Sequence, residues 1–380
     1  MKVVYILGSL NRGGMESLLL DVARQHDAAP FDMVVLHRKG GAYYEDFYGC
    51  GVDIRQLSFH KGRLITYLLS LSRFIAEQEV DVVHTQMAID CIYARLALRL
   101  GRLFGIIHKP IQLVTTFHGF DMGEEVFNRM RRKWAIRMAD KVCFVSQCER
   151  EDYERRYDVG NKGYVIYNGV DFSKVAVKME RGKESERGSE SVPVHPRLGM
   201  VGSFGSGRSH IVVCKALKEL QERNIKIEFY FAGAKRESEA ALYDTCVEYC
   251  RQNNLNNVHF LGNCNNVYSL LQQMDGFVYS TVHDTFGIAV VEAIASGLPT
   301  IVNDWVVMKE VTRDGQWATL FKTEDAEDCA NKIQDLIEHL SERKAKAQEI
   351  AQQVREAYSI EKHIERLNEI YGAVRLRGKE

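Results

Sequence analysis

Short apolar runs alternate with segments of helical periodicity along most of the chain. The first run, residues 3–7, leads into a glycine-containing loop and then into a helical pattern that starts near Met15. Further strand patterns follow at 33–36, 52–57, 80–84, 113–117 and 141–145. Continuous apolar strands separated by helices are typical of a parallel sheet that helices cover on both faces. The first half of the chain is therefore predicted to form an α/β domain.

The same alternation begins again after a polar interruption. Residues 177–196 are rich in Lys, Glu, Ser and Gly, and they are predicted to form a mobile surface loop. Strand patterns then recur at 197–202, 229–233, 258–263, 276–279 and 300–304. A chain of 380 residues exceeds the roughly 250–300 residues at which one core stops growing. We therefore expect two doubly wound α/β domains, over residues 1–171 and 197–358, with 172–196 as the linker.

The composition narrows the possible functions. Hydrophobic residues make up 46% of the chain and charged residues 27%, as in ordinary globular proteins, and the net charge of -1 gives no basis for nucleic-acid binding. Nine cysteines lie mostly in apolar segments without zinc-ligand spacing, so buried free thiols and no metal site are predicted. Residues 1–8 are too short for a signal peptide, and no apolar run reaches the ~18 residues of a membrane span. We expect a cytoplasmic protein, with peripheral contact at the inner face of the plasma membrane as a further option.

Two carboxylates, Asp284 and Glu292, stand eight positions apart after the apolar run 276–279. Thr285 is placed to cap a helix whose first turn contains Gly287, and Glu292 then belongs to the second turn. The unpaired N–H groups and the dipole of a helix N-terminus favour anionic or hydroxyl-rich ligands. The stretch therefore predicts a ligand pocket flanked by both carboxylates, against the simpler alternative of a helix with a solvated Glu.

Two glycine-containing loops follow strands in a way that suits phosphate binding. The first holds Gly13-Gly14-Met15-Glu16, and the second runs from 202 to 209 with Arg208 near its end. Glycine allows backbone N–H groups to approach phosphate closely, and a guanidinium matches phosphate oxygens. The second loop nearly satisfies the P-loop pattern Gly-x4-Gly-Lys-Ser/Thr, with Arg in the Lys position. Arg208 is expected to contact a diphosphate whether or not the loop is a P-loop.

The strand pattern 113–117 ends in His118-Gly119-Phe120-Asp121. A histidine at the carboxyl end of a parallel strand can offer its side chain to a ligand, although it can equally be a structural group with a satisfied hydrogen bond. Asp121 either orients the imidazole or binds a second substrate.

A basic amphipathic segment follows near residue 130. Arg129 and Lys133 alternate there with Met130 and Trp134, and three more arginines stand at 131, 132 and 137. Such a helix is either an ordinary solvated face or a contact surface for anionic lipid headgroups or a diphosphate-linked acceptor.

These motifs, in this order and at this spacing, resemble those of the retaining glycosyltransferases of family 4. That family carries Gly-Gly-x-Glu, His-Gly-x-Asp, an Asn-Gly-Val-Asp segment between its domains, a basic loop, and a Glu-x7-Glu pair. This chain has Asn168-Gly169-Val170-Asp171, and it departs from the family with Asp284 for the first Glu, Ser203 for an Arg and Gln86 for a His. The resemblance covers residues 3–372 and implies the GT-B fold, in which two Rossmann-like domains face a cleft and a final helix, here 359–380, packs back on the first domain.

The resemblance also implies roles for individual residues. The first domain would bind a glycan or lipid-linked acceptor and the second a nucleotide sugar, UDP in preference to GDP, in cell-surface polysaccharide synthesis. His118, Asp284 and Arg208 would be catalytic, Glu16 and Asp121 would bind the acceptor, and no metal is expected because the chain contains no Asp-x-Asp. The residues that the resemblance places at the donor are Glu292, Gly13, Gly14, Phe286, Gly287, Ile288, Ser203, Gly233, Asn263 and Val267. A sugar-nucleotide epimerase, a P-loop nucleotidase and a non-catalytic sugar-nucleotide-binding subunit are the alternatives.

Overall fold

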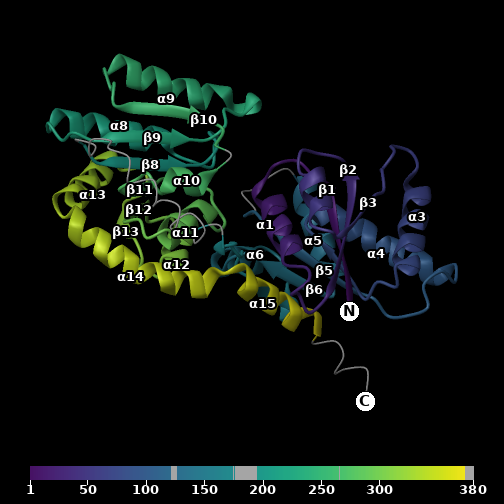
Figure 1. Ribbon diagram of the computed structural model, residues 1–380. Coiled ribbons are helices and arrows are strands. Elements are labelled where there is room, and N and C mark those ends of the chain that lie inside the picture. Colours follow the sequence, from purple (N-terminus) through teal and green to yellow (C-terminus); the bar gives the residue numbers. More distant parts are fainter. Residues whose placement is uncertain (121–125, 174, 176–194, 265, 373–380) are drawn as a thin grey trace. The chain divides into compact units, whose positions relative to one another are not determined.

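The computed structural model describes residues 1–120, 126–173, 175, 195–264 and 266–372. The chain divides into two compact units, one formed by Met1–Gly169 together with the chain from Ile360 onward, and the other by Val170–Ser359. The first unit is purple to blue in Figure 1 except for its last helix, and the second runs from teal to yellow. Most of the predicted loop 177–196 lies outside the described residues.

The first unit is built on a seven-stranded sheet whose strand pairs are all parallel. The strand order is β3-β2-β1-β4-β5-β6-β7. Because the chain moves outward from β1 to β3 and then crosses to β4, the direction of winding reverses between β1 and β4, where α/β sheets usually bind ligands. The strands are β1 Lys2–Ser9, β2 Asp32–Lys39, β3 Asp53–Gln56, β4 Val82–Thr85, β5 Gln112–Phe117, β6 Lys141–Phe144 and β7 Gly163–Val165.

Helices cover both faces of this sheet, and each face has its own apolar core. Ser146 caps α6, because its side chain accepts the N–H of Glu149. The helices are α1 Gly14–Arg24, α2 Tyr44–Gly49, α3 Leu64–Glu77, α4 Ala88–Leu103, α5 Val126–Met138, α6 Gln147–Arg156 and α15 Ile360–Gly372.

The last helix, α15, completes one of the two cores of the first unit. Ile364, Leu367 and Tyr371 on its buried face pack with Val3 and Tyr5 of β1. In Figure 1 this yellow helix lies beside the blue and purple elements of that unit. A helix that begins at Ile360 thus completes a core that is otherwise built from residues 1–166.

The second unit repeats the design with six parallel strands in the order β10-β9-β8-β11-β12-β13. Its winding reverses between β8 and β11. The strands are β8 Arg197–Val201, β9 Glu228–Ala232, β10 Val258–Gly262, β11 Gly276–Tyr279, β12 Thr300–Asn303 and β13 Thr319–Phe321. The helices are α8 His210–Glu222, α9 Ala240–Gln252, α10 Val267–Leu271, α11 Ile288–Ala295, α12 Val306–Val311, α13 Ala326–Glu338 and α14 Leu340–Tyr358. The predicted α/β fold with two parallel sheets is confirmed.

Candidate functional site

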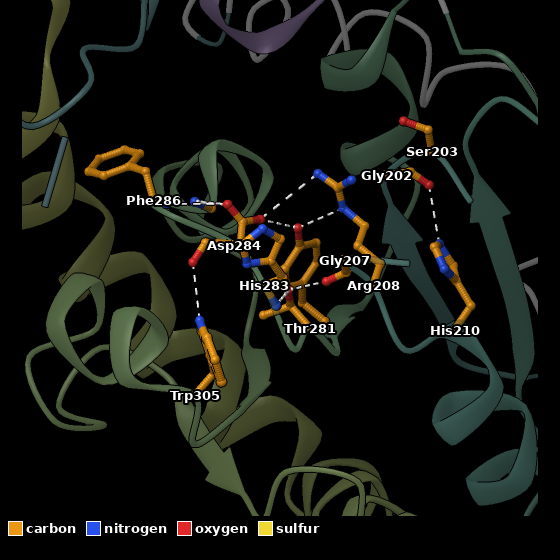
Figure 2. A network of polar contacts seen from close by, with 12 residues as sticks. Gly202, Ser203, Gly207, Arg208, His210, Thr281, His283, Asp284, Phe286 and Trp305 are labelled. Atoms are coloured by element: carbon orange, nitrogen blue, oxygen red, sulfur yellow. Dashed lines mark hydrogen bonds and ion pairs between the residues drawn. The ribbon is translucent and has the colours of Figure 1, made fainter. Parts of the chain in front are cut away.

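In the second unit, the loop that follows β8 is held against the segment that follows β11. The N–H of Val282 donates to the carbonyl of Gly207 at 3.1 Å, and the Thr281 hydroxyl donates to the same carbonyl at 2.6 Å. Both loops leave the sheet at the position where its winding reverses. These contacts therefore bring the predicted phosphate loop, 202–209, next to the predicted carboxylate motif, 284–292, as Figure 2 shows.

A buried tyrosine joins the cation of one loop to the carboxylate of the other (Figure 2). Arg208 Nε donates to the Tyr279 hydroxyl at 2.8 Å, and that hydroxyl donates to Asp284 Oδ2 at 2.6 Å. Arg208 Nη2 lies 3.9 Å from the same carboxylate oxygen. Tyr279 is fully buried, which raises its pKa and keeps it a proton donor, whereas Arg208 and Asp284 remain partly exposed. The tyrosine thus fixes two charged groups that a ligand can reach.

Asp284 also holds the turn that leads into α11, the helix that carries Glu292. Its Oδ1 accepts the N–H groups of Phe286 at 3.2 Å and Gly287 at 3.0 Å. The prediction that Thr285 caps this helix is therefore wrong. The helix begins at Ile288, and its N-cap is Gly287, which has a left-handed φ of 81°. A left-handed residue turns the chain sharply at little cost only if it is glycine, and this turn leaves Asp284, rather than Thr285, facing the N–H groups.

The other residues predicted around Asp284 differ in how much of each side chain is exposed to a ligand. Glu292 lies in the second turn of α11 and is half-buried, and Ile288 is half-buried as well. The Phe286 side chain is buried and packs edge-to-face on Tyr358, with 5.3 Å between the ring centroids. Phe286 therefore contributes to the core of the second unit, and its N–H is already bonded to Asp284.

Glycine is required at position 233 by a close approach of two loops. A Cβ on Gly233 would collide with the carbonyl group of Gly202. The N–H of Gly233 donates to the Gly262 carbonyl at 2.8 Å, so the turns after β8, β9 and β10 are stacked side by side. Asn263 is exposed directly after β10, and Val267 is the first residue of α10.

In the first unit, His118 is paired with Gln86, a residue for which no role is predicted from the sequence. His118 Nε2 lies 2.7 Å from Gln86 Oε1, and the two residues follow β5 and β4, which are neighbours in the sheet. Burial lowers the pKa of His118 to about 4, so its imidazole is neutral at pH 7. A neutral imidazole takes part in hydrogen bonds, such as the one with Gln86, rather than in charge pairing.

An open hollow lies next to this pair. It measures about 240 Å³, slightly below the roughly 300–1,000 Å³ of ordinary ligand pockets. His118 and Gln86 line one side of it, and Arg131 and Arg132 of α5 line another. The hollow thus combines a neutral histidine with two cations.

Behind His118, a chain of buried polar groups links the sheet to α15. Tyr371 of α15 lies 2.7 Å from the Tyr5 hydroxyl and 2.6 Å from His84 Nδ1, and His84 Nε2 lies 2.7 Å from the Thr116 hydroxyl. Burial lowers the pKa of His84 to about 3, so this histidine is neutral too. The internal space that His84 and His118 share measures about 10 Å³, which leaves no room for a sugar. This chain of groups is structural.

The first glycine loop supplies the start of α1. Gly13 is the N-cap residue, α1 begins at Gly14, and the Gly13 carbonyl accepts the N–H of Ser17 at 2.9 Å. The carboxylate of Glu16 folds back against Gly13, and burial raises its pKa. Asp121, the other residue predicted to bind the acceptor, lies outside the described residues.

The described residues contain neither a cluster of metal-binding side chains nor a helix that could span a membrane. Among residues 1–120, 126–173, 175, 195–264 and 266–372, no group of three or more His, Cys, Asp or Glu side chains is arranged to hold a metal ion. In the same ranges, every helix is either too short or too polar to span a membrane.

Comparisons with known proteins agree with this architecture. Residues 12–174 match the family model described as Glycosyltransferase Family 4, and residues 195–339 match the model described as Glycosyl transferases group 1. The chain belongs to glycosyltransferase family 4. The two matched regions together include every described residue discussed above as a site residue in either unit.

Individual relatives of this family 4 chain are distant, and each alignment covers a similar share of both proteins. The GDP-mannose:cellobiosyl-diphosphopolyprenol alpha-mannosyltransferase of Xanthomonas campestris is 27% identical over 323 residues, which is 80% of this chain and 79% of the relative. The UDP-Gal:alpha-D-GlcNAc-diphosphoundecaprenol alpha-1,3-galactosyltransferase of Escherichia coli is 25% identical over 247 residues, covering 62% and 61%. The crystal structure of Anabaena HepE in complex with UDP has a TM-score of 0.81 at 17% identity, covering 98% of this chain and all of that one. The fold is therefore GT-B.

Sequence reasoning missed two residues of these sites. Tyr279 lies in a continuous apolar strand, where a tyrosine normally serves as a core residue, and the pattern carries no sign of its polar contacts. Gln86 replaces a histidine of the family motif and was given no chemistry, although it directly contacts His118. The common signal is position, because each stands at the carboxyl end of a strand or just beyond it.

Proposed function

We propose that this family 4 glycosyltransferase transfers a sugar from a nucleotide diphosphate sugar, UDP in preference to GDP, to a lipid-linked or glycan acceptor with retention of the anomeric configuration. The pathway would be cell-surface polysaccharide synthesis. The observation that carries the proposal is the Arg208–Tyr279–Asp284 arrangement at the reversal point of the second sheet. It presents a fixed cation beside a glycine loop, which suits a diphosphate.

Departure of a nucleoside diphosphate places negative charge on its phosphate oxygens. Groups that stabilise this charge lower the barrier most when they are already oriented in the resting protein. The Tyr279 hydroxyl orients Arg208 in this way, since it accepts the Arg208 Nε hydrogen bond at 2.8 Å. We expect the reaction to need no metal ion. Arg208 would neutralise negative charge on the diphosphate in place of a divalent cation. Glu292 would bind the ribose hydroxyls.

We assign acceptor binding to the first unit. The hollow beside His118 supplies a neutral histidine for sugar hydroxyls and two arginines, Arg131 and Arg132, for anionic groups. The X. campestris and E. coli relatives are named for diphosphopolyprenol and diphosphoundecaprenol acceptors, in which a diphosphate stands between the sugar and the lipid. His118 would orient the reacting sugar, and Glu16 would contribute to acceptor binding.

Contact with an anionic membrane surface is the second part of the proposal. The helix α5 contains five cations and no acidic residue, and four of its large apolar side chains are exposed. Phe127 is 58% exposed and Trp134 46%, and the guanidinium of Arg131 lies 4.0 Å from the Phe127 ring centroid. Exposed aromatic side chains next to cations are the composition that favours the headgroup region of an anionic bilayer. The protein would thus work at the inner face of the plasma membrane.

The proposed transfer is tested first by nucleotide binding. Calorimetry with UDP, GDP, ADP and ATP, each with and without magnesium, should show binding of UDP or GDP without magnesium. Replacing Glu292 by Ala should weaken that binding roughly tenfold or more, since it removes a charged hydrogen-bond partner. The exposed Glu361→Ala variant in α15 is the matched control and should bind as the wild type does.

Transfer itself separates an enzyme from a binding subunit. Radiolabelled UDP-sugars and GDP-sugars are incubated with a polyprenyl-diphosphate-linked sugar, and the anomeric configuration of the product is determined by NMR. Binding of a sugar nucleotide without transfer or donor hydrolysis would favour the non-catalytic subunit. Binding of ATP with magnesium alone would favour the nucleotidase.

The membrane contact is tested by sedimentation with vesicles of phosphatidylglycerol and phosphatidylcholine. The double variant Arg129→Glu/Lys133→Glu should reduce the bound fraction, with affinity falling at least about tenfold because each cation near an anionic surface contributes roughly 1 kcal/mol. Lys61→Glu/Arg73→Glu makes the same charge change at exposed positions elsewhere in the first unit. Equal loss of binding in both variants would reduce the effect to net charge and contradict a role for α5.

A further inference from the structure

The loop between β8 and α8 offers only one cation of its own to a diphosphate. Arg208 is that cation, and position 203 holds a serine. A diphosphate with two to three negative charges is poorly neutralised by a single guanidinium. A second cation in this region would therefore have to come from another element of the unit.

The segment that follows β9 brings such a cation to the loop. Arg236 Nη2 donates to the Ser203 hydroxyl at 3.3 Å. Its position is set by the backbone, because the N–H of Gly202 donates to the Ala232 carbonyl at 2.8 Å and the N–H of Phe204 donates to the Ala234 carbonyl at 3.1 Å. The Arg236 side chain is 52% exposed, so its remaining N–H groups are open to a ligand.

The same place already holds an anion, which is a carboxylate of the chain itself. Glu239 Oε1 accepts the N–H of Ser206 at 2.8 Å, and Glu239 Oε2 lies 3.6 Å from Arg236 Nη1. Hydrogen bonds from Ser206 hold the pKa of this carboxyl below its usual range, so it is ionised at neutral pH. A loop N–H and a guanidinium that converge on one carboxylate have the donor geometry that a phosphate group uses.

We propose that Arg236 is a donor-binding residue that supplies the second cation for the diphosphate, and that Glu239 occupies the phosphate position in the ligand-free protein. On donor binding, a phosphate group would take the N–H of Ser206 and the guanidinium of Arg236 from Glu239. The proposal rests on the proposed function, since it names a further contact of the same donor site. It also explains how the unit can carry Ser203 where the family has an arginine. Arg236 would supply the missing positive charge, and it donates a hydrogen bond to the Ser203 hydroxyl.

Substitutions at the two partners should change nucleotide affinity in opposite directions. Calorimetry with UDP and GDP is carried out on the wild type and on Arg236→Ala and Glu239→Gln. For the nucleotide that the wild type binds, Arg236→Ala should weaken affinity about tenfold, because it removes a charged hydrogen-bond donor. Glu239→Gln should strengthen affinity about two- to tenfold, because a neutral amide competes less well with phosphate for the guanidinium. A purely structural contact would not produce a gain from either change.

The neighbouring Lys235 provides the matched control. Its ammonium pairs with Asp244 at 2.7 Å and it is 44% exposed, so Lys235→Ala removes the same charge one position away. This variant should change affinity less than about twofold. If Arg236→Ala has no larger effect than Lys235→Ala, or if Glu239→Gln does not tighten binding, the inference is overturned while the proposed function stands. If the wild type binds neither nucleotide, both fall together.

Discussion

Replacing Arg208 by alanine is expected to lower kcat/KM for sugar transfer about 100- to 1,000-fold. This is the usual effect of removing one oriented donor from the place where negative charge develops. Arg208 lies where β8 and β11 meet and is held by the Tyr279 hydroxyl, so it needs no rearrangement before it can act. The decrease in kcat should be larger than the increase in KM if the guanidinium interacts more strongly with the departing diphosphate than with the intact donor. Steady-state kinetics with radiolabelled donor measures both constants.

Two conservative variants separate charge from orientation in this test. Arg208→Lys keeps a positive charge but loses the planar guanidinium, and Tyr279→Phe keeps Arg208 while removing the hydroxyl that links it to Asp284. Both should retain more activity than Arg208→Ala, with Tyr279→Phe lowering kcat while the melting temperature falls only modestly. Wild-type kcat/KM in Arg208→Ala would rule out a part for this cation in the reaction.

The fold could be predicted from the sequence because its strands are buried on both faces. Runs such as residues 3–7 and 276–279 are apolar throughout, and each belongs to a strand of a parallel sheet. The pattern is weaker where an element is short. The edge strand β13 has only three residues, Thr319–Phe321, and two of them are half-buried, so its pattern is too short to distinguish a strand from a loop. Edge strands have one neighbour and less need of continuous apolar residues.

The candidate site could be predicted only in part, because side-chain partners depend on register between strands. Arg208 and Asp284 stood out as charged residues in loops after strands, and the structure links them through one hydroxyl. The choice of Thr285 as the helix cap failed because it placed Gly287 inside the first turn of the helix, whereas the left-handed Gly287 precedes the helix, which begins at Ile288. Arg236 reaches the same loop from the turn after another strand, a contact that linear spacing cannot reveal.

A chain that ends at Ser359 is expected to lose the folded structure of the first unit. Five buried side chains of α15 would be removed, namely those of Ile360, Ile364, Leu367, Ile370 and Tyr371. At roughly 1.5–3 kcal/mol per buried side chain, they contribute on the order of 10 kcal/mol, which is comparable to the whole stability of a typical domain at about 5–15 kcal/mol. The truncation also breaks two buried hydrogen bonds. The Lys141 ammonium loses the Ile370 carbonyl as its acceptor, and His84 loses the Tyr371 hydroxyl as its partner. A buried cation without its acceptor adds a further penalty.

Hydrogen exchange followed by mass spectrometry measures this loss separately in each unit. Peptides from β1, β4 and β5 should exchange rapidly in the truncated chain, while peptides from β8 and β11, which pack in the other unit, should remain protected. The full-length double variant Glu361→Ala/Glu369→Ala changes only exposed positions of α15 and should exchange as the wild type does. Native protection of β1 and β4 in the truncated chain would mean that the first sheet is stable without this helix. In that case the buried Tyr5 hydroxyl and His84 Nδ1 would need new hydrogen-bond partners within residues 1–169, because both now bond to the Tyr371 hydroxyl.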